Sequence, residues 1–168
     1  SVLDIGCGPG ALTDGLRQGL GADYALGVDI STSAITYAQQ AHPLTDFAAM
    51  AVGSGMNLKQ TFDIVHAREF YPFTRTSDAD HQFDTLALLA DHTKLGGVII
   101  LTLKANRDKG LEINLNGLAR RLAGIGLWQP ARGVMADTRL EWFLDLATAT
   151  ALTKAIYGAI GRPLVMLY

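Results

Sequence analysis

Several features that often reveal a protein's class are nearly absent from this sequence. Its 168 residues include a single cysteine, Cys7, so no internal disulfide can form and a reducing, cytoplasmic location is expected. A net charge of −2 provides no broad attraction for nucleic acid or for an anionic membrane. No apolar run approaches the ~20 residues of a membrane span. The four histidines are scattered without the spacing of metal ligands. We therefore expect a soluble protein with no metal, no membrane association and no nucleic-acid partner.

The pattern that is present alternates apolar runs with helical periodicity. It predicts strands over residues 1–5, 24–30, 46–50, 61–66, 97–103, 127–134 and 163–168. Helices are predicted over 11–20, 32–41, 80–94, 111–123 and 138–160, with the third one ending just before Gly96-Gly97. This alternation predicts one domain over residues 1–168 with an α/β fold: a doubly wound, mostly parallel seven-stranded sheet with helices on both faces. Because Ser1 is followed at once by a strand pattern, we also expect that N-terminal residues precede it.

A glycine-rich loop follows the first predicted strand, in the stretch D-I-G-C-G-P-G at residues 4–10. Gly6, Gly8 and Gly10 allow sharp turns and leave no side chain between the backbone and a ligand. The helix that follows directs its free amides toward the same loop. Asp29, at the end of the second predicted strand, can accept hydrogen bonds from both ribose hydroxyls. These residues predict a ligand that contains adenosine.

Two cofactors fit this pattern. The stretch from Gly6 to Ala11 satisfies G-x-G-x-x-[GA], which is typical of dinucleotide binding, so an NAD-dependent oxidoreductase is one alternative. Asp4 favours the other, because a carboxylate beside the loop repels a pyrophosphate and attracts the cationic amino and sulfonium groups of S-adenosylmethionine. A non-catalytic binding module is a third reading.

The motif D-I-G-C-G-P-G, followed by G-V-D-I-S, resembles the class I S-adenosylmethionine-dependent methyltransferases. The later stretches F-D-I-V-H-A and L-G-G-V-I-I-L-T-L resemble that family's fourth and fifth strands. The resemblance covers roughly the first 104 residues. It implies a methyltransferase with a Rossmann-like fold that binds S-adenosylmethionine and modifies an acceptor, with a small molecule as the default expectation.

The resemblance also assigns cofactor-binding residues. It implies that the three glycines approach the methionine part, which Asp4 helps to hold, that Asp29 binds the ribose and that Ile30 packs against adenine. The backbone at His66 and Ala67 is expected near the methionine end. The remaining expected contacts are Cys7, packed beneath the loop, and Ala51 and Val52.

One stretch of the sequence departs from the family's pattern, and the acceptor site is less clearly marked than the cofactor site. Many relatives have an acid after the third strand that binds the adenine amine, whereas Met50–Gly53 contains none, so backbone and apolar contacts are expected there. The acceptor side is expected in the loop after the fourth strand, where His66 and Glu69 are the candidate catalytic residues. The long helix over 138–160 is a candidate for substrate binding or for formation of a homo-oligomer.

Overall fold

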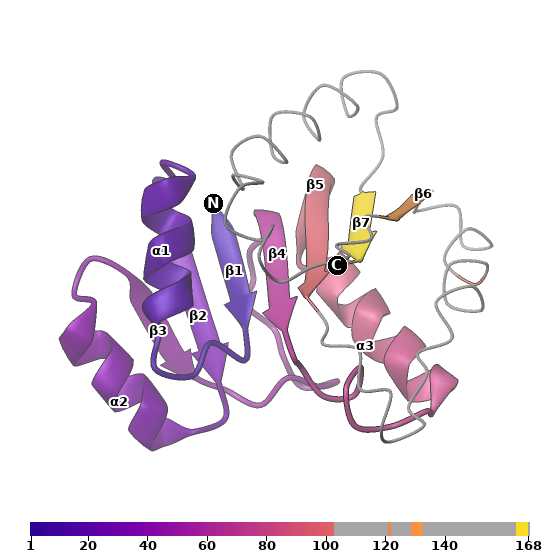
Figure 1. Ribbon diagram of the computed structural model, residues 1–168, viewed down its shortest axis with the longest axis horizontal. Helices are drawn as coiled ribbons and strands as arrows, with labels where there is room; N and C mark the ends of the chain where they lie inside the picture. Colours follow the sequence, from indigo (N-terminus) through magenta and orange to yellow (C-terminus); the bar gives the residue numbers. More distant parts are fainter. Residues whose placement is uncertain (103–120, 122–128, 133–163, 168) are drawn as a thin grey trace, which may run out of the picture.

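The computed structural model describes residues 1–102, 121, 129–132 and 164–167, in the arrangement that Figure 1 shows. The helices are α1 (Ala11–Gly19), α2 (Thr32–Ala41) and α3 (Ala79–Asp91). The strands are β1 (Val2–Ile5), β2 (Ala25–Asp29), β3 (Asp46–Ala49), β4 (Phe62–Arg68), β5 (Thr93–Thr102), β6 (Gln129–Arg132) and β7 (Leu164–Leu167). The predicted helices over 111–123 and 138–160 lie outside the described residues.

The strands form one sheet in the order β3-β2-β1-β4-β5-β7-β6, and every neighbouring pair is parallel. The predicted parallel α/β sheet is therefore confirmed. Residues that face each other across β1 and β4 are set by this register, which places Asp4 opposite His66. In a parallel sheet all strands end at the same edge, so the loops after β1, β2, β3 and β4 meet there.

Helices cover the sheet on both faces, because successive strand side chains point to opposite sides. On one face, Leu3 and Val65 pack with Leu86 and Leu89 of α3 in a core that is fully buried. On the other face, buried strand residues pack against Leu16 of α1. A third cluster joins Cys7 and Phe47 to Ile35 and Ala38 of α2. This burial fixes the glycine loop between the sheet and two helices.

The predicted end of the third helix is wrong. Helix α3 ends at Asp91 and β5 begins at Thr93, so Gly96-Gly97 lies inside the strand rather than at a helix terminus. The Thr93 hydroxyl donates a hydrogen bond to the carbonyl of Leu89 at 2.7 Å and closes the helix there. The pairing of β4 with β5 shifts register over this segment, and the two glycines lie in that irregularity.

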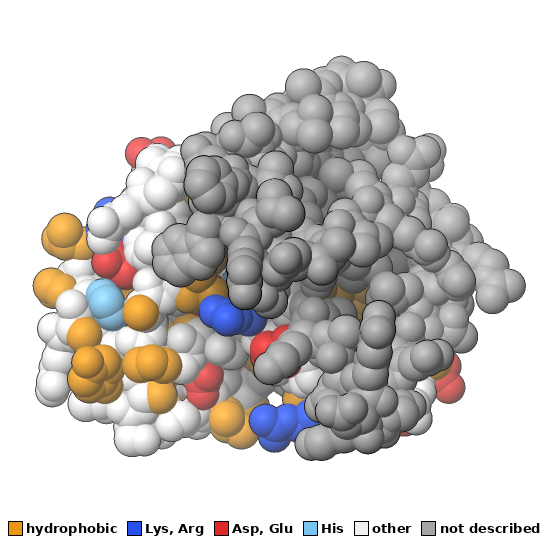
Figure 2. All heavy atoms as spheres, viewed as in Figure 1, with side chains coloured by type: hydrophobic (Ala, Val, Ile, Leu, Met, Phe, Trp, Pro, Cys, Tyr) orange, Lys and Arg blue, Asp and Glu red, His pale blue; other side chains and the backbone are white. Residues whose placement is uncertain are grey.

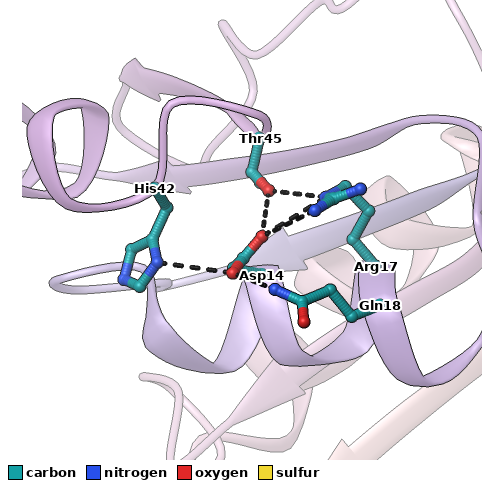
Figure 3. Close-up of polar contacts among 5 residues, drawn as sticks. All are labelled: Asp14, Arg17, Gln18, His42 and Thr45. Atoms are coloured by element: carbon teal, nitrogen blue, oxygen red, sulfur yellow. Dashed lines mark hydrogen bonds and ion pairs between the residues drawn. The ribbon is translucent and has the colours of Figure 1, made fainter.

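A cluster of polar contacts around Asp14 connects helix α1 to the turn between α2 and β3 (Figure 3). The Asp14 carboxylate accepts hydrogen bonds from Thr45 Oγ1 at 2.8 Å, Gln18 Nε2 at 2.5 Å and Arg17 Nη2 at 3.1 Å. The Nδ1 atom of His42 lies 3.5 Å from Asp14 Oδ2, the oxygen that also accepts the bond from Gln18. The hydrogen bond from Thr45 lowers the pKa of Asp14 most. Burial opposes it as the second-largest effect, and hydrogen bonds from Arg17 and Gln18 lower the pKa further.

Exposed hydrophobic side chains gather on part of the surface. Figure 2 shows them over the region of α2, and Ile30, Tyr37 and Leu44 are among the exposed large hydrophobic residues. Of these, Ile30 lies directly after β2, at the edge where the strands end. Among the described residues, no helix is long and apolar enough to cross a membrane.

Candidate functional site

The glycine loop turns over the end of β2. The amides of Gly6 and Cys7 both donate to the carbonyl of Val28, at 2.8 and 3.1 Å. Gly8 has a φ of 53°, and a Cβ placed on it would meet nothing within 4 Å. Gly10 has a φ of 84°, and a Cβ there would lie 2.6 Å from the ring of Phe47. Gly10 is therefore required for packing, whereas Gly8 borders open space that a ligand can occupy.

Asp29 joins this loop to the end of β2. Its Oδ2 accepts a hydrogen bond from the Gly8 amide at 2.9 Å, and its Oδ1 accepts one from the Ser31 amide at 2.8 Å. A carboxylate offers about four acceptor positions, so Asp29 can hold the loop and still accept bonds from two hydroxyls. The structure thus brings together the two features that the sequence assigned to an adenosine ligand.

Apolar surface lies next to Asp29. The side chain of Ile30 is 77% exposed, which leaves its surface available to a flat ring. The Met50 amide donates to the Asp29 carbonyl at 2.8 Å and holds the loop after β3 against the end of β2. In that loop Ala51 is exposed, and Val52 is partly buried against the core. This arrangement fits adenine held by apolar and backbone contacts.

Asp4 lies beneath the loop rather than on its open side. Only 2% of the residue is exposed. Its Oδ2 accepts a hydrogen bond from Thr13 Oγ1 at 2.6 Å, and its Oδ1 lies 2.8 Å from Nδ1 of His66. Both carboxylate oxygens therefore have partners within the protein.

His66 is also buried, with 5% of the residue exposed. Its Nε2 lies 3.3 Å from the Thr102 hydroxyl at the end of β5, so the imidazole links three strands. Sequence reasoning identified Asp4 and His66 but missed Thr13 and Thr102. Alternation of side chains along β1 and β4 could have placed the first two on one face, but only the strand register pairs them.

The predicted end of the fourth strand is too early: β4 extends to Arg68, so His66 and Ala67 lie inside the strand, and Glu69 is the first residue of the loop after it. The backbone of Ala67 pairs with Ile5 beside the start of the glycine loop. Glu69 is exposed, adopts a φ of 50°, and donates its amide to the Thr102 carbonyl at 2.8 Å. A Cβ on Gly6 would lie 3.0 Å from the Phe70 ring, so this loop closely approaches the glycine loop. Glu69 thus lies on the surface of the edge where the strands end.

Cys7 is buried in the loop, where it packs with Ile35 and Ala38 of α2 and with Phe47. Burial raises the pKa of its thiol to about 12, with further contributions from the negative charges of Asp4 and then Asp29. The thiol is therefore protonated at neutral pH and does not act as a nucleophile. Over the described part of the chain, no group of three or more His, Cys, Asp or Glu residues could hold a metal ion.

Comparison with known proteins identifies the family. Residues 2–97 match the family described as methyltransferase domain. A putative methyltransferase, 235L, from Invertebrate iridescent virus 6 is 34% identical over 65 residues, which are 39% of this chain and 24% of the relative. The chain thus spans about a quarter of the length of that curated relative.

Solved structures share the fold. A TehB-like S-adenosylmethionine-dependent methyltransferase from Corynebacterium glutamicum has a TM-score of 0.58 and 20% identity, over 74% of this chain and 63% of that one. The sugar N-methyltransferase KedS8 from Streptoalloteichus has a TM-score of 0.55 and 21% identity, over 66% of this chain and 43% of that one. At these identities the likeness supports the fold, and the match over residues 2–97 supports the family. This chain belongs to the methyltransferase domain family.

Proposed function

We propose that this protein is an S-adenosylmethionine-dependent methyltransferase that modifies a small molecule, built on a seven-stranded class I sheet. The observation that carries the proposal is the joined site of Asp29, the open face of Gly8 and the exposed side chain of Ile30. Asp29 and Ile30 match the ribose and adenine of an adenosine ligand in polarity, and the open face of Gly8 leaves room for the rest of the ligand.

Each part of the site has one task in binding the donor. The carboxylate of Asp29 accepts the ribose hydroxyls, and Ile30 with Val52 and the backbone of Ala51 borders the adenine. Gly6, Gly8 and the backbone of Ala67 lie beside the methionine end. S-adenosylmethionine supplies a methyl group on a sulfonium that is already a good leaving group. The protein's task is therefore to align the acceptor and exclude water.

A small-molecule acceptor agrees with the charge of the chain and with its relatives. The net charge of −2 gives no electrostatic reason to expect nucleic acid. KedS8, which shares the fold, is a sugar N-methyltransferase. Glu69 is the better candidate for direct contact with the acceptor, because it is exposed at the sheet edge whereas the side chain of His66 is buried. A cytoplasmic location and a homo-oligomer stay predictions.

The alternative of an NAD-dependent oxidoreductase is less consistent with the charges. The buried carboxylate of Asp4 lies beneath the loop that would hold the pyrophosphate, and its negative charge opposes such a ligand. A non-catalytic module would bind the donor without turnover, so an activity assay separates it from the proposed enzyme.

The acceptor side is tested by measuring S-adenosylhomocysteine formation with a panel of amino sugars, small amines and phenols. Glu69→Gln should lower kcat by roughly 100-fold where a base is needed, with affinity for S-adenosylhomocysteine unchanged. Asp84→Asn, at an exposed acid of α3, is the matched control and should keep full turnover. Full turnover in Glu69→Gln would remove Glu69 from the reaction, and binding of the donor without turnover of any acceptor would favour the non-catalytic module.

A further inference from the structure

A buried polar chain runs beneath the glycine loop through three strands and one helix. Thr13 Oγ1 in α1 lies 2.6 Å from Asp4 Oδ2, and His66 Nδ1 in β4 lies 2.8 Å from Asp4 Oδ1. At the far side of the imidazole, Nε2 lies 3.3 Å from the Thr102 hydroxyl in β5. Asp4, Thr13 and His66 are each at least 95% buried. We call these three residues the Asp4 clamp.

The hydrogen bonds of the clamp are complete when it carries one negative charge. An ionised carboxylate only accepts hydrogen bonds, so Nδ1 of His66 must carry the proton that it shares with Asp4. A neutral imidazole then has a lone pair on Nε2, to which the Thr102 hydroxyl can donate a hydrogen bond. The Thr13 hydroxyl donates to the remaining carboxylate oxygen. Every donor has an acceptor in this arrangement.

Two carboxylates adjoin the glycine loop: Asp4 lies in the strand that leads into it, and Asp29 accepts a hydrogen bond from its Gly8 amide at 2.9 Å. Cys7 belongs to the loop, and burial raises the pKa of its thiol first, followed by the charges of Asp4 and Asp29. A cation bound at the loop would interact favourably with the same charges.

We propose that Thr13 and His66 are positioning residues for cofactor recognition, which hold Asp4 as a buried anion so that the site prefers the cationic methyl donor to its neutral-sulfur product. This inference rests on the proposed function. S-adenosylmethionine and S-adenosylhomocysteine share adenosine and amino-acid groups and differ by the methyl group and the positive charge on sulfur. The affinity for S-adenosylmethionine divided by that for S-adenosylhomocysteine, called here the affinity ratio, therefore reports the charge that the site presents to sulfur.

The first experiment measures Kd for both ligands by calorimetry in the wild-type protein, in Asp4→Asn and in Asp23→Asn. Asp23 is an exposed acid between α1 and β2 and is the matched control for loss of one charge. Asp4→Asn should weaken the binding of S-adenosylmethionine at least fivefold more than the binding of S-adenosylhomocysteine. Asp23→Asn should leave the affinity ratio unchanged. A purely structural role for Asp4 would weaken both ligands equally and would contradict the proposal.

Two pairs of variants test the positioning residues. His66→Asn retains an amide donor near the position of Nδ1, and Thr13→Ser retains the hydroxyl, so both should keep the wild-type affinity ratio. His66→Leu and Thr13→Val remove one donor each and should lower the ratio toward that of Asp4→Asn. A ratio that rises several-fold in His66→Asn would show that a protonated imidazole cancels the charge of Asp4, and would overturn the proposal.

A readout without cofactor separates this inference from the proposed function. Cys7 is the only cysteine, so its alkylation by iodoacetamide at pH 9 reports its thiolate fraction. Asp4→Asn should react several-fold faster than Asp23→Asn, with unchanged circular dichroism in both. Equal rates would contradict an anionic Asp4. Wild-type protein that binds neither ligand would instead refute the proposed function, and with it the recognition role of the clamp.

Discussion

The single thiol of this protein is buried beneath the glycine loop, and that burial determines its chemistry. Burial, and after it the charges of Asp4 and Asp29, raise the pKa of Cys7 to about 12. A small apolar group is what the packing against Phe47 and Ala38 requires at this position. Cys7 is thus a packing residue whose reactivity is suppressed.

This suppression can be measured directly. At pH 8 a thiol with the ordinary pKa of 9.0 is about one-tenth thiolate, whereas a pKa of about 12 leaves about one part in ten thousand. Iodoacetamide should therefore alkylate native Cys7 roughly 1000-fold more slowly than the chain in guanidinium, as followed by intact mass. Equal rates in the two states would contradict the assigned burial and charge.

Local and long-range residues differ in how well the sequence predicts them. The glycine loop and Asp29 could be predicted because a strand end, its turn and the next strand end lie within 30 residues. The pairing of Asp4 with His66 could not, since 62 residues separate them and a shift of one residue in register would abolish it. Thr13 and Thr102 have no motif of their own and gain their role from that pairing.

At the scale of elements, Gly8 and Gly10 both have a positive φ but have different functions. Gly10→Ala places a Cβ 2.6 Å from Phe47 and 2.8 Å from Ala38, where α1 and α2 meet β3. We expect a loss of about 2–3 kcal/mol in the free energy of unfolding from this overpacking. Thermal unfolding of the variant and of the wild-type protein measures it.

Gly8→Ala is the matched variant, because its Cβ meets no atom within 4 Å. Its positive φ should lower the free energy of unfolding by roughly 1 kcal/mol, while the added methyl group obstructs the ligand side of the loop. We expect affinity for S-adenosylhomocysteine to fall at least tenfold. If Gly8→Ala were the less stable variant, or bound the ligand normally, the division of roles within the loop would be wrong.

The Asp14 cluster should make the contact of α1 with the α2–β3 turn depend on pH. The folded protein lowers the pKa of Asp14, chiefly through the hydrogen bond from Thr45. This stabilisation is present above the carboxyl's ordinary pKa and is lost as the pH falls through the lower folded value. Asp14→Asn should therefore lower Tm by about 2–4 °C at pH 7, and the difference from the wild-type protein should shrink below pH ~4.

The control for this prediction is Asp23→Asn, which removes an exposed acid and should leave Tm unchanged at both pH values. A Tm difference for Asp14→Asn that stayed constant from pH 7 to pH 3 would show that the carboxylate charge is not what stabilises the contact.

Element boundaries show where local patterns mislead. Gly96-Gly97 has the composition of a helix end, yet α3 ends at Asp91 and the glycines lie in β5. The Phe62 amide donates a hydrogen bond to the carbonyl of His92, and the residues after His92 continue as a strand of the sheet. A local sequence pattern cannot predict this contact, because the two residues are far apart in the sequence. The start of α2, by contrast, agrees with the predicted helix over 32–41, since the Ser31 cap that begins it involves only neighbouring residues.

At the scale of the whole molecule, a parallel sheet brings the loops after β1, β2, β3 and β4 to one edge. The alternation of strands and helices in the sequence predicts this arrangement, because each apolar run must be covered by a helix on one face or the other. The acceptor is less well determined. Its site depends on a few exposed groups after β4, and methyl transfer from a sulfonium demands alignment more than a fixed set of catalytic side chains.

The most direct test of the account is a calorimetric titration of the protein with S-adenosylhomocysteine, with NAD titrated in parallel and Asp29→Ala as the site variant. The account predicts binding of S-adenosylhomocysteine and none of NAD. It also predicts a loss of affinity of at least tenfold in Asp29→Ala, which removes both the ribose acceptor and the bond to the Gly8 amide. Binding of NAD alone, or unchanged affinity in Asp29→Ala, would contradict it.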